Sequence, residues 1–231
     1  MNTRKLLIDS LTELDITCSE KQTDAFMIYL SELKKWNRAY NLTGLKSDED
    51  IIIKHFVDSL LFVKVMPDTQ LLIAYVGTGA GFPGIPVKII RPETEITLID
   101  SSRKKTAFLR HITRRLELKR INVVQQRIEN LDSSYKKKYD SIISRATFSI
   151  KEFLVIACPY IKDGGNLILN KGPKITKELM ELDKFPDEKK CVKDILNLQL
   201  PYLKADRSLV VLECKKGPEC NNPNSRPYVK M

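Results

Sequence analysis

Apolar residues recur at helical spacing through the first part of the chain. Members of this pattern are Phe26, Tyr29, Leu30, Leu33, Trp36 and Tyr40. Such three- and four-residue intervals predict an amphipathic helix. A second apolar-rich helix is expected over residues 48–66, with Asp48 as its cap and acidic Glu49 and Asp50 in its first turn. We therefore expect residues 1–66 to form a helical extension, in which Trp36 and Tyr40 belong to the core.

From residue 71 onward, short apolar runs alternate with helical stretches. The predicted strands cover residues 71–76, 96–100, 121–125, 139–144, 166–170, 192–200 and 208–213. Helices are expected over residues 102–117 and 150–158. Alternation at this spacing predicts a doubly wound α/β fold with a mostly parallel sheet. The last two runs have little between them, so the final strand is expected to be antiparallel. Residues 67–231 would form this domain, in one compact unit with the extension.

Composition indicates a globular chain without a membrane span. Of its 231 residues, 42% are hydrophobic and 29% charged. Residues 69–87 are uncharged, but their four glycines and two prolines favour a glycine-rich loop over a span. Residues 1–14 are interrupted by charges and lack the apolar core of a signal peptide. We therefore expect a cytoplasmic protein.

The cysteines predict neither a metal site nor a disulfide framework. Cys18, Cys158, Cys191, Cys214 and Cys220 form an odd set without a CxxC pair, and the chain has only 2 histidines. The expectation is five reduced thiols and no bound metal.

Positive charge is concentrated in the second part of the chain. Residues 1–70 hold 9 of the 39 basic residues (Lys and Arg) and 11 of the 29 acidic residues (Asp and Glu). Residues 71–231 hold the other 30 basic and 18 acidic residues. A basic region of this kind is typical of proteins with a polyanionic partner, because Lys and Arg that meet phosphates release counterions. Many basic proteins bind no nucleic acid, so charge alone does not identify the partner.

A glycine-rich loop follows the first predicted strand. Gly77-Thr78-Gly79-Ala80-Gly81-Phe82-Pro83-Gly84 allows two interpretations. The spacing of Gly79, Gly81 and Gly84 matches the dinucleotide fingerprint, in which a helix N-terminus holds a pyrophosphate. The spacing of Gly77, Gly79 and Gly81 matches the loop that bends around the methionine part of S-adenosylmethionine. The pattern alone does not decide between them.

Asp100 is a candidate ligand for the ribose of either cofactor. It ends the strand after the glycine loop, 21 residues beyond Gly79. A carboxylate there can accept hydrogen bonds from both ribose hydroxyls. The alternative role is a cap for the helix that begins near Ser102.

Several motifs occur in the same order along residues 27–172. They are Trp36-Asn37-x-x-Tyr40-Asn41-Leu42-Thr43, His55-x-x-Asp58-Ser59-Leu60, Val76-Gly77-Thr78-Gly79-Ala80-Gly81-Phe82-Pro83-Gly84-Ile85-Pro86, Leu98-x-Asp100-Ser101, Arg103-Lys104, Phe108-Leu109-Arg110, Arg127-Ile128-Glu129, Ser144-Arg145-Ala146, Gly164-Gly165 and Lys171-Gly172. With these motifs the chain resembles the RsmG (GidB) family of small-subunit rRNA guanine-N7 methyltransferases. A weaker match follows at residues 207–211.

The resemblance implies a class I methyltransferase fold and S-adenosyl-L-methionine as cofactor. By position, Gly77, Gly79 and Phe82 would line the methionine part and Asp100 would bind the ribose. Ile128 and Glu129 would border the adenine, and Arg145 would lie beside cofactor and substrate. The implied partner is 16S rRNA of the small ribosomal subunit, modified at a guanine in the hairpin loop near the decoding site.

Tyr75 departs from the family pattern. Two residues before the first motif glycine the family normally has Asp, and this chain has tyrosine. A tyrosine is neutral at pH 7 and much bulkier. We expect weaker cofactor binding than in the family, by about 1.5–3 kcal/mol, the contribution of one charge-assisted hydrogen bond.

Guanine N7 carries a free lone pair, so its methylation needs positioning and no general base. Arg145 and Asp58 are the positioning candidates; Asp58 could accept from the guanine amino edge, or instead be a helix-surface acid or a capping partner. His55 is expected to be structural.

Candidate RNA contacts are Arg103, Lys104, Arg110, Lys171 and Arg207. The competing functions are an RNA-binding module that has lost methylation, which Tyr75 favours, and an NAD(P)-dependent oxidoreductase.

Overall fold

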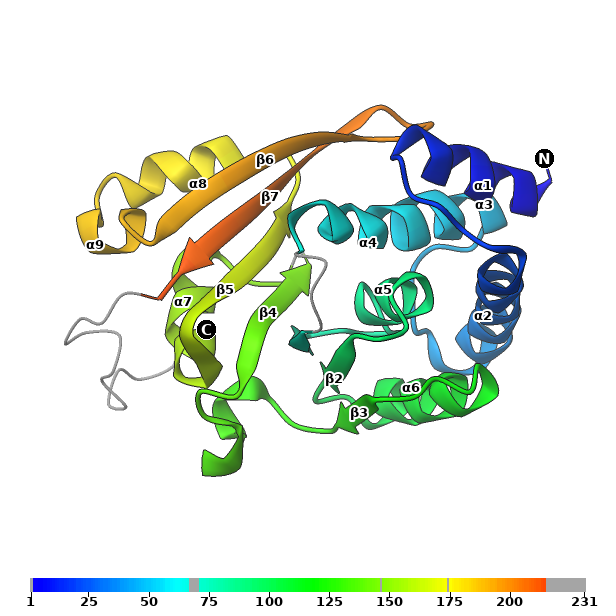
Figure 1. Ribbon diagram of the computed structural model, residues 1–231, viewed down its shortest axis with the longest axis horizontal. Coiled ribbons are helices and arrows are strands. Elements are labelled where there is room, and N and C mark those ends of the chain that lie inside the picture. Colours follow the sequence, from blue (N-terminus) through cyan, green and yellow to red (C-terminus); the bar gives the residue numbers. More distant parts are fainter. Residues whose placement is uncertain (1, 67–70, 146, 174, 215–231) are drawn as a thin grey trace.

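A computed structural model describes residues 2–66, 71–145, 147–173 and 175–214 (Figure 1). Residues 215–231 lie outside the described ranges.

The described residues form a seven-stranded sheet with the order β3-β2-β1-β4-β5-β7-β6. Its strands are β1 Leu72–Val76, β2 Glu95–Ile99, β3 Ile121–Val124, β4 Tyr139–Arg145, β5 Ile161–Lys171, β6 Val192–Leu200 and β7 Ala205–Glu213. β7 pairs antiparallel with both β5 and β6, and the other pairs are parallel. The predicted α/β fold with an antiparallel last strand is confirmed. The main difference is β5, which begins five residues before the predicted start.

Helices cover both faces of this sheet (Figure 1). They are α1 Thr3–Glu13, α2 Glu20–Tyr40, α3 Asp48–Ile51, α4 Asp58–Leu60, α5 Gly84–Ile90, α6 Arg103–Arg115, α7 Ile150–Ala157, α8 Ile175–Leu182 and α9 Pro186–Lys189. Short helical turns are η1 Ile52–Val57, η2 Leu61–Val65, η3 Ile128–Asn130, η4 Ser133–Tyr135 and η5 Cys158–Tyr160.

Side chains of β1 alternate between two hydrophobic clusters, as a strand requires. Ile73 and Tyr75 belong to a cluster that also contains α1, α2, α5 and α6 residues. Ala74 and Val76 belong to the cluster under α7 and α8. The first cluster runs from Leu6 to Leu209, so the N-terminal helices share a core with one face of the sheet.

The second predicted helix is irregular. It begins at Asp48, but its cap is Ser47, whose hydroxyl accepts from Asp50 N at 3.1 Å. The prediction of Asp48 as cap was wrong because Asp48 already has helical backbone geometry and lies in the first turn. Its middle, η1, is a π-helix, a wider turn that is frequent at functional sites.

Tyr40 corrects a second expectation. It is 46% exposed, so it does not belong to the core, and its ring is tilted by 37° against Trp36 with ring centroids 5.3 Å apart. Trp36 is half-buried against the first cluster and contacts Phe108 of α6. Tyr40 is one turn further along α2, at its exposed end.

A disulfide joins Cys158 and Cys214, whose Cα atoms are 5.7 Å apart. The expectation of five free thiols was therefore wrong for these two. The sheet brings them together, because α7 ends beside the end of β7, although 56 residues separate them. Cys18 and Cys191 are free, and Cys220 lies outside the described residues.

None of the helices in the described part of the chain combines the length and apolarity that crossing a bilayer requires. Residues 72–87 form β1, the glycine loop and the start of α5. Within the described ranges no three His, Cys, Asp or Glu side chains are grouped to hold a metal ion.

Candidate cofactor and substrate pocket

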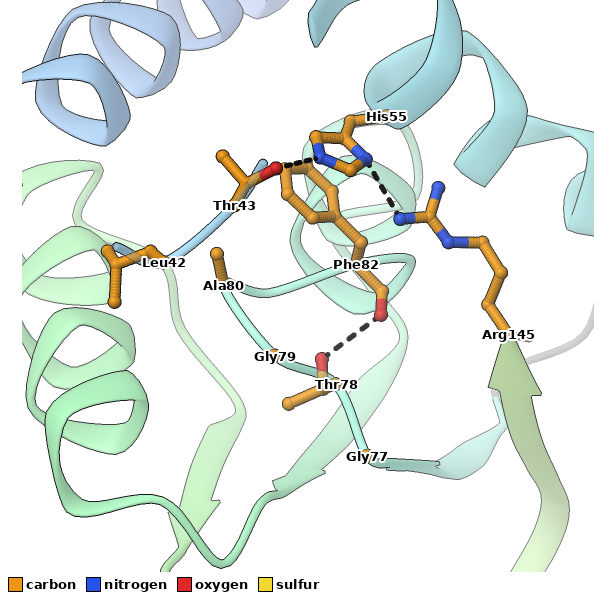
Figure 2. Close-up of a pocket in the computed structure, with 9 residues that line it drawn as sticks. All are labelled: Leu42, Thr43, His55, Gly77, Thr78, Gly79, Ala80, Phe82 and Arg145. Carbon is orange, nitrogen blue, oxygen red and sulfur yellow. Dashed lines mark hydrogen bonds between the residues drawn. The ribbon is translucent and has the colours of Figure 1, made fainter. Parts of the chain in front are cut away.

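A pocket of about 130 Å³ opens at the carboxyl ends of β1 and β4 (Figure 2). Its lining residues are Leu42, Thr43, His55, Gly77, Thr78, Gly79, Ala80, Phe82 and Arg145. Pockets for drug-sized ligands occupy roughly 300–1,000 Å³. A space of this size suits the reacting end of a ligand, with the rest of the ligand lying along the sheet edge.

The glycine loop leaves open space at its centre. Gly77 and Gly79 have φ values of +65° and +61°, which favour glycine. A Cβ at Gly79 would meet no atom within 4 Å, whereas one at Gly81 would lie 2.6 Å from the Tyr29 hydroxyl. Gly79 thus presents bare backbone to a cavity, and Gly81 permits close packing of α2. The loop fits a ligand that approaches the backbone closely.

Asp100 holds the glycine loop and the start of α6 together. Its Oδ2 accepts from Gly79 N at 2.8 Å, and its Oδ1 accepts from Ser102 N at 2.9 Å. Asp100 therefore bonds the residue that precedes α6, and it does not cap the free amides of the first turn of that helix. Each carboxylate oxygen has a second lone pair, so the side chain retains capacity to accept from ribose hydroxyls.

Arg145 reaches the pocket from the end of β4 and is fixed by three acceptors on the N-terminal helices. Its Nη1 donates to Lys54 O at 3.0 Å and to Asp58 Oδ2 at 3.2 Å. Its Nη2 donates to His55 Nδ1 at 3.0 Å. The guanidinium carbon lies 5.3 Å from the centre of the Phe82 ring, within cation–π range. Burial lowers the pKa of Arg145, and Asp58 opposes this by favouring the charged form.

Asp58 lies behind Arg145 and does not line the pocket. It is 5% exposed, so it is not a helix-surface acid. Its Oδ1 accepts from Arg207 Nε of β7 at 2.7 Å and from Asn170 Nδ2 of β5 at 3.4 Å. One carboxylate thus connects α4 with three strands. The group of two arginines and one aspartate has an excess of positive charge, which favours an anionic ligand group at Arg145.

His55 is a pocket residue. Its ring stacks on Phe82, with centroids 4.2 Å apart and an interplanar angle of 18° (Figure 2). Burial, and secondarily the charge of Arg145, lower the pKa of His55 to about 3. The imidazole is therefore neutral at physiological pH.

The residues expected at the adenine lie beyond the enclosed pocket. Ile128 is 2% exposed and packs in the second cluster, and Glu129 beside it is exposed. Both belong to η3, which follows β3 at the same edge of the sheet as the glycine loop.

The candidate RNA contacts fall into two groups. Arg103, Lys104 and Arg110 are exposed on α6, opposite its buried apolar side. Lys171 instead forms an ion pair with Glu178 at 2.8 Å, and Arg207 is engaged by Asp58. Of these five candidates, only the α6 group has no acidic partner among the described residues, so it could meet phosphates without breaking an ion pair.

Tyr75 is fully buried and faces α5 instead of the pocket. A Cβ at Gly84 would lie 2.9 Å from the Tyr75 ring, so the ring fills the space beneath the first turn of α5. Its hydroxyl has no hydrogen-bond partner among the described residues. Burial raises the pKa of this hydroxyl, which stays protonated.

Thr43 and Leu42 were not predicted as pocket residues. Both lie in the Trp36–Thr43 motif, which indicates the family but does not indicate that its last two residues line a pocket. The sequence feature that could have identified them is their place directly after the end of α2. The chain leaves this helix at Asn41, which has φ +49°, and turns toward the glycine loop.

The sequence matches the family described as "GidB: rRNA small subunit methyltransferase G" over residues 22–210. The chain belongs to this family. A relative named "Ribosomal RNA small subunit methyltransferase G" from Acetivibrio thermocellus is 39% identical, covering 91% of this chain and 88% of the relative. The protein of that name from Geotalea uraniireducens is 37% identical, covering 91% and 96%.

Solved structures give the same fold at low identity. A SAM-dependent methyltransferase from Aquifex aeolicus has a TM-score of 0.54 at 17% identity, covering 79% of this chain and 98% of that protein. TYW2 of P. horikoshii, solved with MeSAdo, has a TM-score of 0.52 at 15% identity, covering 68% and 61%. The chain thus has a class I methyltransferase fold, and the methyltransferase interpretation of the glycine loop is the correct one.

Proposed function

We propose that this chain transfers a methyl group from S-adenosyl-L-methionine to N7 of a guanine in the decoding-region hairpin loop of 16S rRNA. The observation that carries the proposal is the open glycine loop facing a fixed Arg145 guanidinium, in a chain of the rRNA small subunit methyltransferase G family. The protein would act in the cytoplasm on the small ribosomal subunit.

In this proposal the cofactor supplies an electrophilic methyl group when bound. Gly77, Gly79 and Phe82 would hold its methionine part, and Arg145 would offer a cation to its carboxylate. Asp100 would accept from the ribose, with Ile128 and Glu129 beside the adenine.

The protein's contribution to the reaction would be alignment of the two substrates in the pocket. N7 presents a lone pair, so no proton has to be removed before it reacts. The side chains agree with this chemistry, because His55 is neutral and its acceptor nitrogen already binds Arg145. Asp58 is likewise engaged by two arginines, so its role is to position Arg145.

The target base would be presented from an RNA loop or flipped out of its stack. Arg103, Lys104 and Arg110 would contact phosphates, because they are exposed on α6, which starts at the same sheet edge as the pocket. Lys171 and Arg207 hold acidic partners, which argues against the same role for them.

The test is methyl transfer from labelled S-adenosylmethionine to 30S subunits that lack the modification, with nucleoside analysis of the product. Labelled N7-methylguanosine is the expected result. Transfer by Tyr75→Asp but not by the unaltered chain would mean that Tyr75 impairs an otherwise intact enzyme. Absence of transfer by both, with retained binding to the subunit, would favour the RNA-binding module instead.

A further inference from the structure

Thr43 lies at the rim of the pocket, on the opposite side from the glycines, and is held there by hydrogen bonds (Figure 2). Its backbone N donates to Asn37 Oδ1 at 2.9 Å, which anchors the turn to α2. Its hydroxyl oxygen makes two contacts, with His55 Nε2 at 2.7 Å and with Leu45 N at 3.2 Å.

The direction of these hydrogen bonds follows from Arg145. A guanidinium only donates, so His55 Nδ1, 3.0 Å from Arg145 Nη2, must be the acceptor. A neutral imidazole then carries its proton on Nε2 and donates to the Thr43 oxygen. The low pKa of His55, about 3, agrees with this neutral tautomer.

The Thr43 hydroxyl is therefore limited to donating. A hydroxyl has two lone pairs and one proton. Both lone pairs are used, one by His55 Nε2–H and one by the Leu45 N–H. The proton has no acceptor among the residues that the structure describes. A ligand that meets this hydroxyl must supply an acceptor.

We propose that Thr43 donates this hydrogen bond to O6 of the target guanine and so selects guanine over adenine. The inference rests on the proposed function. Guanine carries O6, an acceptor, next to N7, whereas adenine carries an amino group, a donor, at the same place. N7 itself must stay free to receive the methyl group, so a recognition contact on that edge falls on the six-position. A hydroxyl that can also accept would tolerate both bases, and one with both lone pairs occupied rejects the adenine amino group.

Guanine fits this position better than the cofactor does. Thr43 comes from the loop after α2 and His55 from η1, while the glycines expected at the methionine part come from the loop after β1. A second acceptor that could reach the Thr43 hydroxyl is the carboxylate of the cofactor. Measuring cofactor affinity distinguishes this contact from one with guanine.

The experiment compares wild type, Thr43→Val and Thr43→Ser on two substrates. One is the 30S subunit lacking the modification; the other is a 30S subunit reconstituted with 2-aminopurine at the target position, a base that keeps N7 and lacks O6. Cofactor dissociation constants and melting temperatures are measured for each variant. Valine also leaves the His55 and Leu45 donors without their acceptor, so the comparison between the two bases carries the test.

The expected result in Thr43→Val is a fall of about 2- to 13-fold in the preference for guanine over 2-aminopurine, taken as the ratio of the two kcat/KM values, which is the range for one hydrogen bond. Thr43→Val should therefore lose less activity on 2-aminopurine than on guanine, and Thr43→Ser should restore the preference for guanine. Cofactor affinity should stay within about twofold of wild type, less than the weakest hydrogen bond is worth.

An equal loss on both bases would overturn the role of Thr43 in base selection. A cofactor affinity that falls by the same factor as kcat/KM would assign the hydroxyl to the cofactor. No transfer by wild type to unmodified 30S subunits would instead refute the proposed function, and this inference with it.

Discussion

Replacing Asp58 by asparagine tests the buried charge group behind the pocket. The side chain of Asp58 is 7% exposed, and those of its partners Arg145 and Arg207 are 16% and 20% exposed. Asparagine keeps the shape but removes the negative charge, so two guanidinium groups face each other without a counterion. Removing one partner of a buried pair costs about 3–5 kcal/mol. The partial exposure of the arginines places the expected loss near the lower end, about 3 kcal/mol.

Such a loss is a large share of the stability of a typical domain, which is roughly 5–15 kcal/mol. For a chain of this size it corresponds to a fall in melting temperature of about 6–12 °C. The assay is urea unfolding followed by circular dichroism, with thermal unfolding beside it. The matched control is Asp183→Asn, whose ion pair with Lys189 has side chains 57% and 61% exposed. An exposed pair contributes about 0–1 kcal/mol, so the control should unfold nearly as wild type does.

A double variant separates lost charge balance from lost packing. Arg207→Met in the Asp58→Asn background removes one of the two unbalanced cations, so part of the stability should return. If Asp58→Asn unfolded within about 1 kcal/mol of wild type, as expected only for an exposed pair, or if the double variant were no more stable than the single one, the electrostatic explanation would be refuted.

Three further predictions follow from groups around the pocket. Tyr75→Phe removes a buried hydroxyl without a partner and should raise the free energy of unfolding by up to about 1–3 kcal/mol, measured in urea; a less stable variant would show that the hydroxyl is bonded. The pKa of His55 is lowered to about 3 from an unfolded value near 6.5, so its stabilising effect is complete above pH 6.5 and is lost as pH falls toward 3. Between pH 7 and pH 4, wild type should therefore lose more stability in urea than His55→Asn, and equal losses would contradict a neutral buried ring. Alanine at Arg103, Lys104 or Arg110 should each reduce the slope of log K against log salt for 30S binding by about 0.7–0.9, and an unchanged slope would exclude a phosphate contact.

The local pattern of apolar residues and glycines in the sequence was sufficient to predict most of the fold. Each strand has its own apolar run, and the glycine loop is contiguous, so both could be predicted from neighbouring residues. The π-helical turn over Ile52–Val57 could not, because its apolar spacing resembles that of an ordinary helix and its geometry depends on packing against other elements. Tyr40 has the spacing of a core residue and yet lies at the exposed end of α2.

Contacts between distant residues account for what was missed in the site. Asp58 was a candidate, but its partners Arg145 and Arg207 lie 87 and 149 residues away, and no spacing rule connects them. The role of His55 depends on the same arginine, which decides the tautomer of the ring. Cys158 and Cys214 are paired only because the sheet places their elements side by side.

The long sequence separation between Asp58 and Arg207 has a consequence for folding during synthesis on the ribosome. A ribosome adds about 5–20 residues per second, so the 149 residues between them take about 7–30 seconds to make. During that interval the acid already exists while one of its two cations is still untranslated. The pocket can reach its final charge balance only when β7 has been synthesised. A nascent fragment ending before β7 therefore lacks a finished pocket, and methyl transfer would have to wait until nearly the whole chain has been translated.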